Sequence, residues 1–357
     1  MIVQKIALTN FRNFSDWQHE ITHSTVFVIG SNGSGKTAVC EALYYGCFAR
    51  SFKTHTPREL IQFGAAYATI VLTFEGRQGP GVFHAGMDGT KKIIKINEKQ
   101  VTTARQLMTM LPVVIFSEFD MNVVTGGPRE RRTFIDQYLL LSNPDYVHAL
   151  HTLGKIVDQR NALLQKSGIR DQAFLHWSRV LWQHSCTIQE QRRNALANLM
   201  NSVNELTKDA PFSWHITASY QPREELGTDF DVFWRENQAL FLLEERQRKT
   251  LFGAHVDDSI FFLNDRPARL FSSRGQQKLL VFLLKCAVIQ LLKETGEPPL
   301  FILDDIMVDF DDQRINFVAN ILKHLGCQLF ITSTMATTAL NGHFEPHTAQ
   351  KITLGNF

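Results

Sequence analysis

A single glycine-rich segment constrains the fold of this chain more than any other feature. Residues 30–37 read GSNGSGKT and match the pattern GxxxxGK[ST]. The apolar run TVFVI precedes this segment, and AVCEAL, which favours a helix, follows it. A strand, a glycine-rich turn and a helix in this order form a phosphate-binding loop, and this context argues against a chance glycine-rich turn. The sequence therefore predicts an α/β fold with a nucleotide site.

The residue types of this loop suit the binding of a triphosphate and Mg²⁺. Glycines let the backbone curl so that its N–H groups and the helix N-terminus point at phosphate oxygens. We expect Lys36 to reach the β and γ phosphates and Thr37 to bind the metal. The predicted ATP-binding residues of the loop are Gly30, Ser31, Asn32, Gly33, Ser34, Gly35, Lys36 and Thr37.

Two carboxylates end the apolar run PLFIL and supply the acidic part of the predicted site. We expect Asp304 to bind Mg²⁺ together with Thr37, and Asp305 to polarise the attacking water. Lys36, Asp304 and Asp305 are thus the predicted catalytic residues. Two carboxylates after a strand can instead cap a helix, and we expect Asp311 and Asp312 to cap the helix that follows.

The segment SSRGQQK lies directly before a predicted helix at about 275–294. Its residues Ser273, Arg274, Gly275 and Gln276 have the order and spacing, relative to the acidic strand, of an ABC ATPase signature. A helix N-terminus is a second anion site, yet the chain already has a phosphate-binding loop. We therefore expect the signature to bind the nucleotide of a second copy, so that ATP joins two chains. The alternative is a simple serine cap on a core helix.

Hydrophobic patterning divides the chain into three stretches. Short alternating strand patterns fill the first hundred residues, helical spacing dominates 103–250, and strands and helices alternate again afterwards. Strands joined by helices indicate a parallel sheet. We predict an ABC-type P-loop ATPase head with an antiparallel β subdomain over 1–110 and 250–357, and a mostly helical second domain over 111–249.

Composition excludes some classes of protein and leaves others open. The formal net charge is only +2, so a nucleic-acid surface must come from local clusters of Lys and Arg. The five cysteines include no CxxC pair, which argues against a disulfide framework or a zinc site. The apolar run at 279–292 is interrupted by Lys285 and is too short to span a bilayer, so we expect a cytoplasmic protein.

Four segments of the chain resemble the RecF family of DNA replication and repair ATPases, and the similarity runs over nearly the whole sequence. They are LTNFRNF with the loop and CEALYYGCFARSFK, then VVIFSEFDMNVVTGGPRERRTFIDQYL, GAHVDDSIFFLNDRPARLFSSRGQQK and FILDDIMVDFDDQR. The resemblance implies a head domain like those of SMC proteins. It also implies that Arg12 lies near the nucleotide and that Asp311 belongs to a loop facing the dimer partner.

This sequence departs from the RecF pattern at several positions. Glu118, Phe119 and Asp120 stand where the family has Pro-Glu-Asp, Ala254 replaces a proline, and Asp309 replaces a glutamate. No histidine follows the predicted strand CQLFITST, where transporter ATPases place a switch histidine. Thr332 or Ser333 is the candidate contact for the γ phosphate there.

The resemblance implies ATP-dependent binding to double-stranded DNA near gaps, slow DNA-stimulated ATP hydrolysis, and recombination mediator proteins as partners. Clustered basic residues offer salt-sensitive contacts to DNA phosphates, although most such charges are simply solvated. The candidates are Arg129, Arg131 and Arg132 after a Gly-Gly-Pro turn, and Lys155, Arg160 and Lys166 on a predicted helix. We expect Trp177, Trp182 and Trp234 to be core residues.

Two other functions share parts of this pattern. A nucleotide-binding structural DNA clamp with little turnover would keep the loop, but intact Lys36, Asp304 and Asp305 argue against it. The motor subunit of a membrane transporter would share the loop, signature and acidic strand. The large helical region after residue 103 and the missing switch histidine argue against a transporter subunit.

Overall fold

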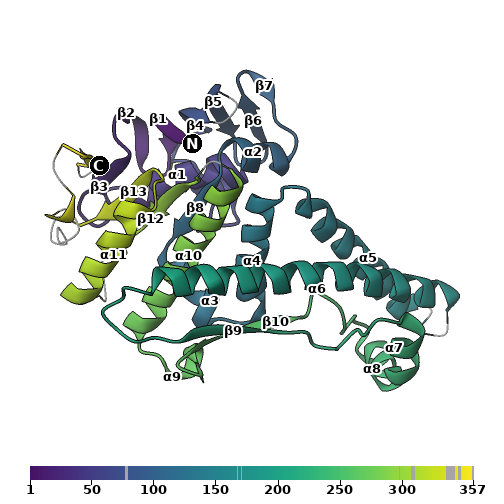
Figure 1. Cartoon of the computed structure of the whole chain (residues 1–357). Coiled ribbons are helices and arrows are strands. Elements are labelled where there is room, and N and C mark those ends of the chain that lie inside the picture. The colour runs from purple at the N-terminus through teal and green to yellow at the C-terminus, as the bar shows by residue number, and fades with distance from the viewer. Residues whose placement is uncertain are drawn as a thin grey trace. The chain divides into compact units, whose positions relative to one another are not determined.

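The computed structural model describes the chain except residues 77–78, 167, 170, 297, 307–309, 335–341, 345–346 and 356–357. The chain forms two compact units (Figure 1). The first comprises 1–121, 202–214 and 272–357, and the second comprises 122–201 and 215–271. These boundaries differ from the domains expected at 1–110, 111–249 and 250–357. A strand at 113–116 joins the sheet of the first unit, whereas 215–271 belongs to the second.

A parallel sheet with the strand order β14-β3-β13-β12-β8 is the centre of the first unit. All four neighbouring pairs are parallel, and β3, β8, β12 and β13 are buried along their whole length, which explains their continuous apolar runs. Helix α10 packs on β8, and α1 packs on β8 and β13. The bounds are β3 Thr25–Ile29, β8 Val113–Phe116, β12 Leu300–Leu303, β13 Leu329–Ser333, β14 Ala349–Thr353, α1 Lys36–Phe48, α10 Arg274–Thr295 and α11 Asp312–His324.

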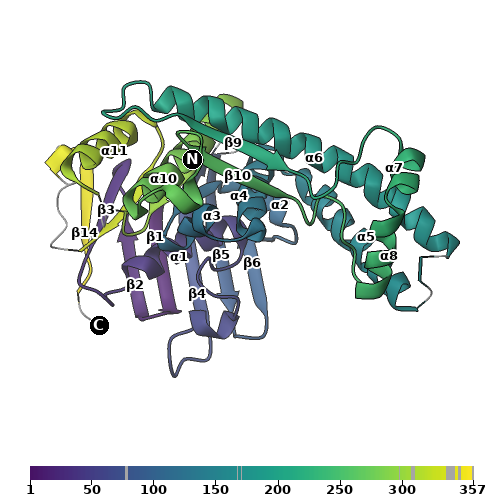
Figure 2. The same cartoon turned by 90° about the horizontal axis from the view of Figure 1, so that it is seen from below.

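The predicted antiparallel subdomain is the second sheet of this unit, with the order β2-β1-β4-β5-β6-β7. Figure 2 shows β4, β5 and β6 side by side. An Asp88-Gly89 turn joins β5 to β6: Asp88 Oδ1 accepts from the N–H of Lys91 at 2.8 Å, and Gly89 has a φ of 87°. The bounds are β1 Ile2–Phe11, β2 Phe14–Glu20, β4 Ala68–Gly76, β5 Gly79–Met87, β6 Lys92–Ile96, β7 Lys99–Gln100, α2 Ala104–Met110, and two 3₁₀ helices, η1 Pro57–Leu60 and η2 Glu118–Met121.

Helix α10 is buried inside the first unit. Of the described helices, it alone has the length and mean hydropathy of a membrane span, but 78% of its apolar window is buried in the protein. A core helix passes the same test, so this is weak support for a membrane segment. Residues 279–289 of this helix are all buried and, apart from Lys285, apolar, so this part of the helix can be covered on every side.

The second unit is mostly helical and contains one three-stranded sheet, β11-β10-β9. Its core is rich in phenylalanine, and Trp177, Trp182 and Trp234 pack against that core, as predicted. The Trp182 Nε1–H donates to Leu226 O at 2.7 Å. The bounds are α3 Asn122–Thr125, α4 Pro128–Ser142, α5 Tyr146–Lys166, α6 Gln172–Leu206 (which continues into the first unit), β9 Ile216–Gln221, α7 Phe230–Glu236, α8 Gln238–Gln247, β10 Asp258–Leu263, β11 Arg266–Pro267 and α9 Ala268–Phe271.

A histidine in the second unit whose ring nitrogens are buried should make stability depend on pH. Burial lowers the pKa of His255 to about 4, and the charges of Arg132, Arg160 and Lys249 act in the same direction. Between about pH 6.5 and 4 the unfolded chain binds a proton that the folded chain does not, so stability falls as the pH falls. We expect the unfolding free energy to drop by roughly 1 kcal/mol per pH unit in this range. Urea unfolding of wild type and His255→Gln at pH 7 and 5 measures the drop. An equal drop in both proteins would contradict the assignment to His255.

Candidate functional site

The glycine-rich loop adopts a conformation that its residue types require. Gly33 and Gly35 have φ angles of 85° and 94°, in the left-handed region that favours glycine. A Cβ on Gly35 would also come within 2.7 Å of the Phe14 ring. Lys36 begins α1, and its Nζ donates to Gly30 O at 2.9 Å and to Ser31 O at 2.8 Å. The ammonium group therefore lies against the loop that precedes the helix.

The first carboxylate after β12 contacts two hydroxyl groups. Thr37 Oγ1 donates to Asp304 Oδ1 at 3.2 Å, and Thr332 Oγ1 donates to the same oxygen at 2.8 Å. The Asp305 N–H in turn donates to Thr332 Oγ1 at 2.9 Å. Of the two candidates named for the end of β13, the structure thus places Thr332 beside the acidic pair, whereas the Ser333 hydroxyl donates to Thr334 O. The sequence did not indicate this link between β12 and β13.

The environment of Asp304 suits a bound divalent cation. Burial raises the pKa of this carboxyl, the charge of Asp305 raises it further, and the hydrogen bonds from Thr332 and Thr37 oppose the rise. A cation beside the carboxylate would offset the cost of burying its charge. Mg²⁺ prefers oxygen ligands, and Thr37 Oγ1 and Asp304 Oδ1 are such ligands, only 3.2 Å apart. The residues present therefore fit Mg²⁺.

Arg12 is held at the site by a carboxylate that sequence analysis missed. Its Nε and Nη2 each donate to Glu41 at 2.6 Å, and its Nη1 donates to Glu59 O at 2.7 Å. The Glu41 side chain is 1% exposed and also accepts from the Ser51 hydroxyl. Ser51 Oγ accepts from the Lys53 N–H at 2.8 Å. In the sequence, the sign that Glu41 could have such a role is that it is a lone carboxylate in the apolar helix after the loop.

One pocket of about 570 Å³ brings most of the predicted site together, and its volume is in the range of small-molecule sites. Its walls come from the loop, the acidic pair, the turn between β1 and β2, and the segment around η1. Gly30, Ser31 and Ser34 do not line it; Gly30 and Ser34 are buried, whereas Ser31 is exposed. The predicted residues that line it are Arg12, Asn32, Gly33, Gly35, Lys36, Thr37, Asp304, Asp305 and Thr332, joined by others that include Asn13, Lys53, Glu59, Ile61 and Phe63.

The signature segment caps α10. Ser273 Oγ accepts from the Gln276 N–H at 3.3 Å, and Gln276 Oε1 accepts from the Ser273 N–H at 2.8 Å. The alternative interpretation of this segment, a simple serine cap on a core helix, predicts a cap of this kind. This cap uses the serine oxygen as an acceptor and leaves the hydroxyl proton for another bond. Binding of a partner's nucleotide by Ser273, Arg274, Gly275 and Gln276 stays a prediction.

Two of the residues that depart from the RecF pattern, Glu118 and Asp120, make contacts within the first unit. Glu118 accepts from Arg274 at 2.6 Å in an exposed ion pair, and Asp120 pairs with Lys285 at 2.6 Å in a largely buried one. Asp311 caps α11, as predicted, by accepting from the Arg314 N–H at 2.9 Å. The proposed role of Asp311 at a dimer interface stays a prediction. Asp309 lies outside the described residues.

The prediction that Arg131 contacts DNA is corrected by the structure. Its side chain is 7% exposed and donates to both carboxylate oxygens of Asp258, at 2.7 and 2.9 Å. Arg132 is half-buried and donates to Asp257 O. Arg131 and Arg132 thus link α4 to β10 and to Asp257, which directly precedes β10. Arg129, Lys155 and Lys166 are exposed and remain candidates for contact with DNA phosphates.

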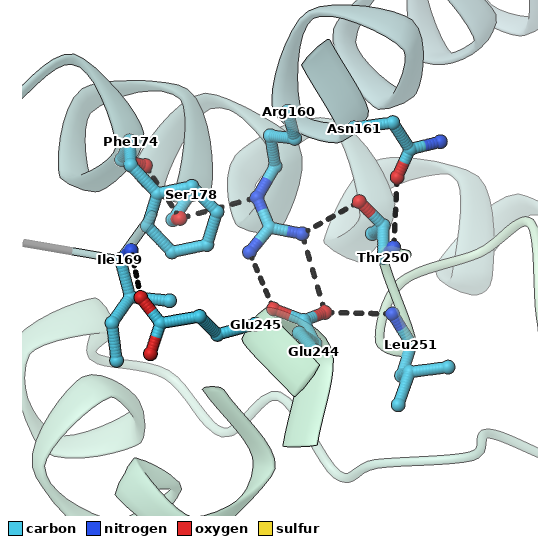
Figure 3. A network of polar contacts seen from close by, with 9 residues as sticks. All are labelled: Arg160, Asn161, Ile169, Phe174, Ser178, Glu244, Glu245, Thr250 and Leu251. Atoms are coloured by element: carbon cyan, nitrogen blue, oxygen red, sulfur yellow. Dashed lines mark hydrogen bonds and ion pairs between the residues drawn. The ribbon is translucent and has the colours of Figure 1, made fainter. Parts of the chain in front are cut away.

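The same correction applies to Arg160, which is fully buried in the second unit (Figure 3). Its guanidinium donates to Glu244 at 2.7 and 3.3 Å and to Thr250 Oγ1 at 3.0 Å. The guanidinium carbon lies 4.5 and 4.7 Å from the ring centroids of Phe174 and Phe252. Arg160 therefore belongs to the helical core and does not face nucleic acid.

Comparison with known proteins shows which family shares this architecture. The family model described as the RecF/RecN/SMC N terminal domain matches residues 2–349. A DNA replication and repair protein RecF of Halalkalibacterium halodurans is 31% identical over 345 residues, covering 94% of this chain and 93% of the relative. A solved structure of the recombination mediator protein RecF-ATP in the RecFOR pathway has a TM-score of 0.84 and 24% identity, covering 94% of this chain and 92% of its own. An Smc head domain from Pyrococcus furiosus has a TM-score of 0.59 and 14% identity, covering 99% and 94%. The predicted fold class is confirmed.

Proposed function

The chain belongs to the RecF/RecN/SMC N-terminal domain family, and from this premise we propose that it is an ATP-driven DNA-binding protein of recombinational DNA repair and replication. It binds ATP and Mg²⁺, hydrolyses ATP slowly with stimulation by DNA, and forms an ATP-dependent homodimer on double-stranded or gapped DNA. The observation that carries the proposal is one pocket lined by the glycine-rich loop, Arg12 and the acidic pair. Relatives named for DNA replication and repair supply the biological role.

Different residues of the pocket bind different parts of the triphosphate and its metal. The N–H groups of the loop and the N-terminus of α1 hold phosphate oxygens, and Lys36 adds a full positive charge next to them. Arg12, fixed by Glu41, adds a second positive charge on the same pocket. Thr37 and Asp304 would hold Mg²⁺, which would neutralise charge on the β and γ phosphates.

Asp305 is the residue of this chain that would orient the attacking water. It is exposed and lines the pocket, and its N–H is fixed by Thr332 Oγ1. A carboxylate in this position accepts a hydrogen bond from water and aligns it with the terminal phosphorus. Asp304, in contrast, is half-buried and already accepts two hydroxyl hydrogen bonds, which suits a metal ligand.

Asp305→Asn is expected to slow ATP hydrolysis by about 100-fold or more and to leave ATP affinity nearly unchanged, because the amide cannot accept a proton. Steady-state phosphate release and equilibrium ATP binding measure the two quantities. Asp312→Asn, an exposed aspartate outside the pocket, is the matched control. Hydrolysis at the wild-type rate in Asp305→Asn would contradict this role.

The dimer and DNA parts of the proposal rest on the signature cap and on exposed basic residues. Ser273 has its oxygen at the N-terminus of a 22-residue helix, where a partner's phosphates would meet the positive end of the helix dipole. Arg129, Lys155 and Lys166 are exposed and available for phosphate contacts. Such contacts position a protein on DNA without reading its sequence.

The nucleotide-binding clamp with little turnover is the second candidate function. The reciprocal helix cap at Ser273 is the observation that favours it, since a signature held in its own helix cap need not contact a partner's nucleotide. Wild-type protein that binds ATP and duplex DNA but releases no phosphate above background would support the clamp.

A further inference from the structure

One aromatic side chain at the nucleotide pocket is fully exposed. Phe63 has a relative exposure of 104%, the highest value among the exposed large apolar side chains of the described chain. It lines the same pocket as Lys36 and Thr37. Exposing a benzyl group to water is unfavourable, and an uncovered aromatic ring that lines a small-molecule pocket is placed to contact a ligand.

The turn that carries Phe63 is fixed to the first β-hairpin. Gln62 N donates to Asn10 O at 2.8 Å, and Arg12 N donates to Leu60 O at 2.8 Å. The Gln62 side chain also donates to Ser15 Oγ at 2.9 Å. Segment 60–62 therefore adds to the end of β1, where Arg12 also lies. The exposure of Phe63 is not the consequence of a detached loop.

Local backbone chemistry directs the turn at residue 63. The Ala65 N–H donates to Gln62 O at 3.0 Å, which closes a turn over residues 62–65. Gly64 occupies its third position with a φ of 84°, as the type II turn requires. A residue with a side chain would be strained at position 64, so the glycine keeps Phe63 at the exposed corner.

The pocket combines two kinds of chemistry that match the two ends of a nucleotide. Lys36, Thr37 and Asp304 suit the triphosphate and its metal. Ile61 and Phe63 also line the pocket and offer apolar surface instead. A nucleobase is the flat aromatic part of a nucleoside triphosphate, and the π-face of any base can stack on a phenyl ring.

We propose that Phe63 stacks on the nucleobase of the bound nucleotide and thereby makes the site prefer nucleoside triphosphates to inorganic tripolyphosphate. This inference rests on the proposed nucleotide site and adds a residue that selects for the base. Stacking uses the face of the base and reads no hydrogen-bonding edge. Phe63 therefore strengthens the binding of ATP and GTP equally and contributes nothing to a ligand without a base.

The test compares Phe63→Ala with wild type for binding of ATP, GTP and inorganic tripolyphosphate, each with Mg²⁺, by isothermal titration calorimetry. Loss of stacking is expected to weaken ATP and GTP by roughly 5- to 100-fold and to leave tripolyphosphate within about 2-fold. Phe63→Tyr should restore nucleotide affinity because it keeps the ring. Phe119→Ala is the matched control, since Phe119 is 51% exposed and does not line the pocket.

Two results would overturn the inference, and a third separates it from the proposed function. Equal weakening of all three ligands would show that Phe63 only shapes the loop, and unchanged affinity for all three would show that it makes no contact. Both results leave the nucleotide site intact. Wild-type protein that binds neither ATP nor tripolyphosphate would instead contradict the proposed nucleotide site itself.

Discussion

Lys36→Met is expected to abolish measurable ATP binding at micromolar nucleotide and to stop hydrolysis. The Lys36 ammonium lies 2.9 and 2.8 Å from Gly30 O and Ser31 O, at the loop where phosphates would bind. Hydrogen bonds between a charged donor and phosphate are about twice as strong as neutral ones, and the methionine side chain keeps the volume without the charge. We expect affinity to fall by about 100-fold or more, as measured by equilibrium binding of a fluorescent ATP analogue.

The control for this variant is Lys99→Met, which removes one positive charge from an exposed position of β7 outside the pocket. It should bind ATP like wild type. If Lys36→Met bound ATP with wild-type affinity, the glycine-rich loop would not be the nucleotide site. The account of Thr37, Asp304 and Asp305 would then lose its basis as well.

Arg160→Met is expected to destabilise the second unit by about 3–5 kcal/mol, because it leaves the carboxylate of Glu244 buried without its counter-charge. Both side chains are 0% exposed. Among the hydrogen bonds of the described residues, Glu244 would retain the one that it accepts from the Leu251 N–H, at 2.6 Å. Urea unfolding followed by tryptophan fluorescence reports on this unit, since it contains Trp177, Trp182 and Trp234.

An exposed pair in the same unit provides the matched control. Arg179 and Asp231 also lie 2.6 Å apart, but their side chains are 47% and 68% exposed. Arg179→Met should cost less than about 1 kcal/mol, because water screens this pair. The double variant Arg160→Met/Glu244→Leu should be less destabilised than the sum of its single variants, since it removes both buried charges. Equal effects of Arg160→Met and Arg179→Met would contradict the role assigned to burial.

Local sequence patterns predicted those parts of the site whose chemistry is local. The conformation of Gly33 and Gly35, the start of α1 at Lys36, and the position of Asp304 after β12 all follow from short segments. The Asp311 cap likewise depends on an N–H three residues further along the chain. Such features are settled by backbone geometry within a few residues, so one sequence is enough to predict them.

The features that the sequence did not predict depend on contacts between distant segments. Arg131 pairs with a residue 127 positions away, and Arg160 with one 84 positions away, so both have the pattern of surface charges until the chain folds. Glu41 looks like an isolated charge in an apolar helix, yet it holds Arg12 at the site. The exposure of Phe63 is equally invisible in the sequence, where a phenylalanine between Gln62 and Gly64 suggests a core residue.

Sedimentation velocity of the purified protein, with and without ATP and a duplex DNA fragment, tests the central claim most directly. The account predicts a shift from monomer to dimer with ATP, strengthened by DNA, and no shift for Lys36→Met. Ser273→Arg should still bind ATP at its own pocket, which Ser273 does not line, but should remain a monomer. A wild-type monomer under every condition would contradict an ATP-dependent dimer and would leave the Ser273 segment as a helix cap alone.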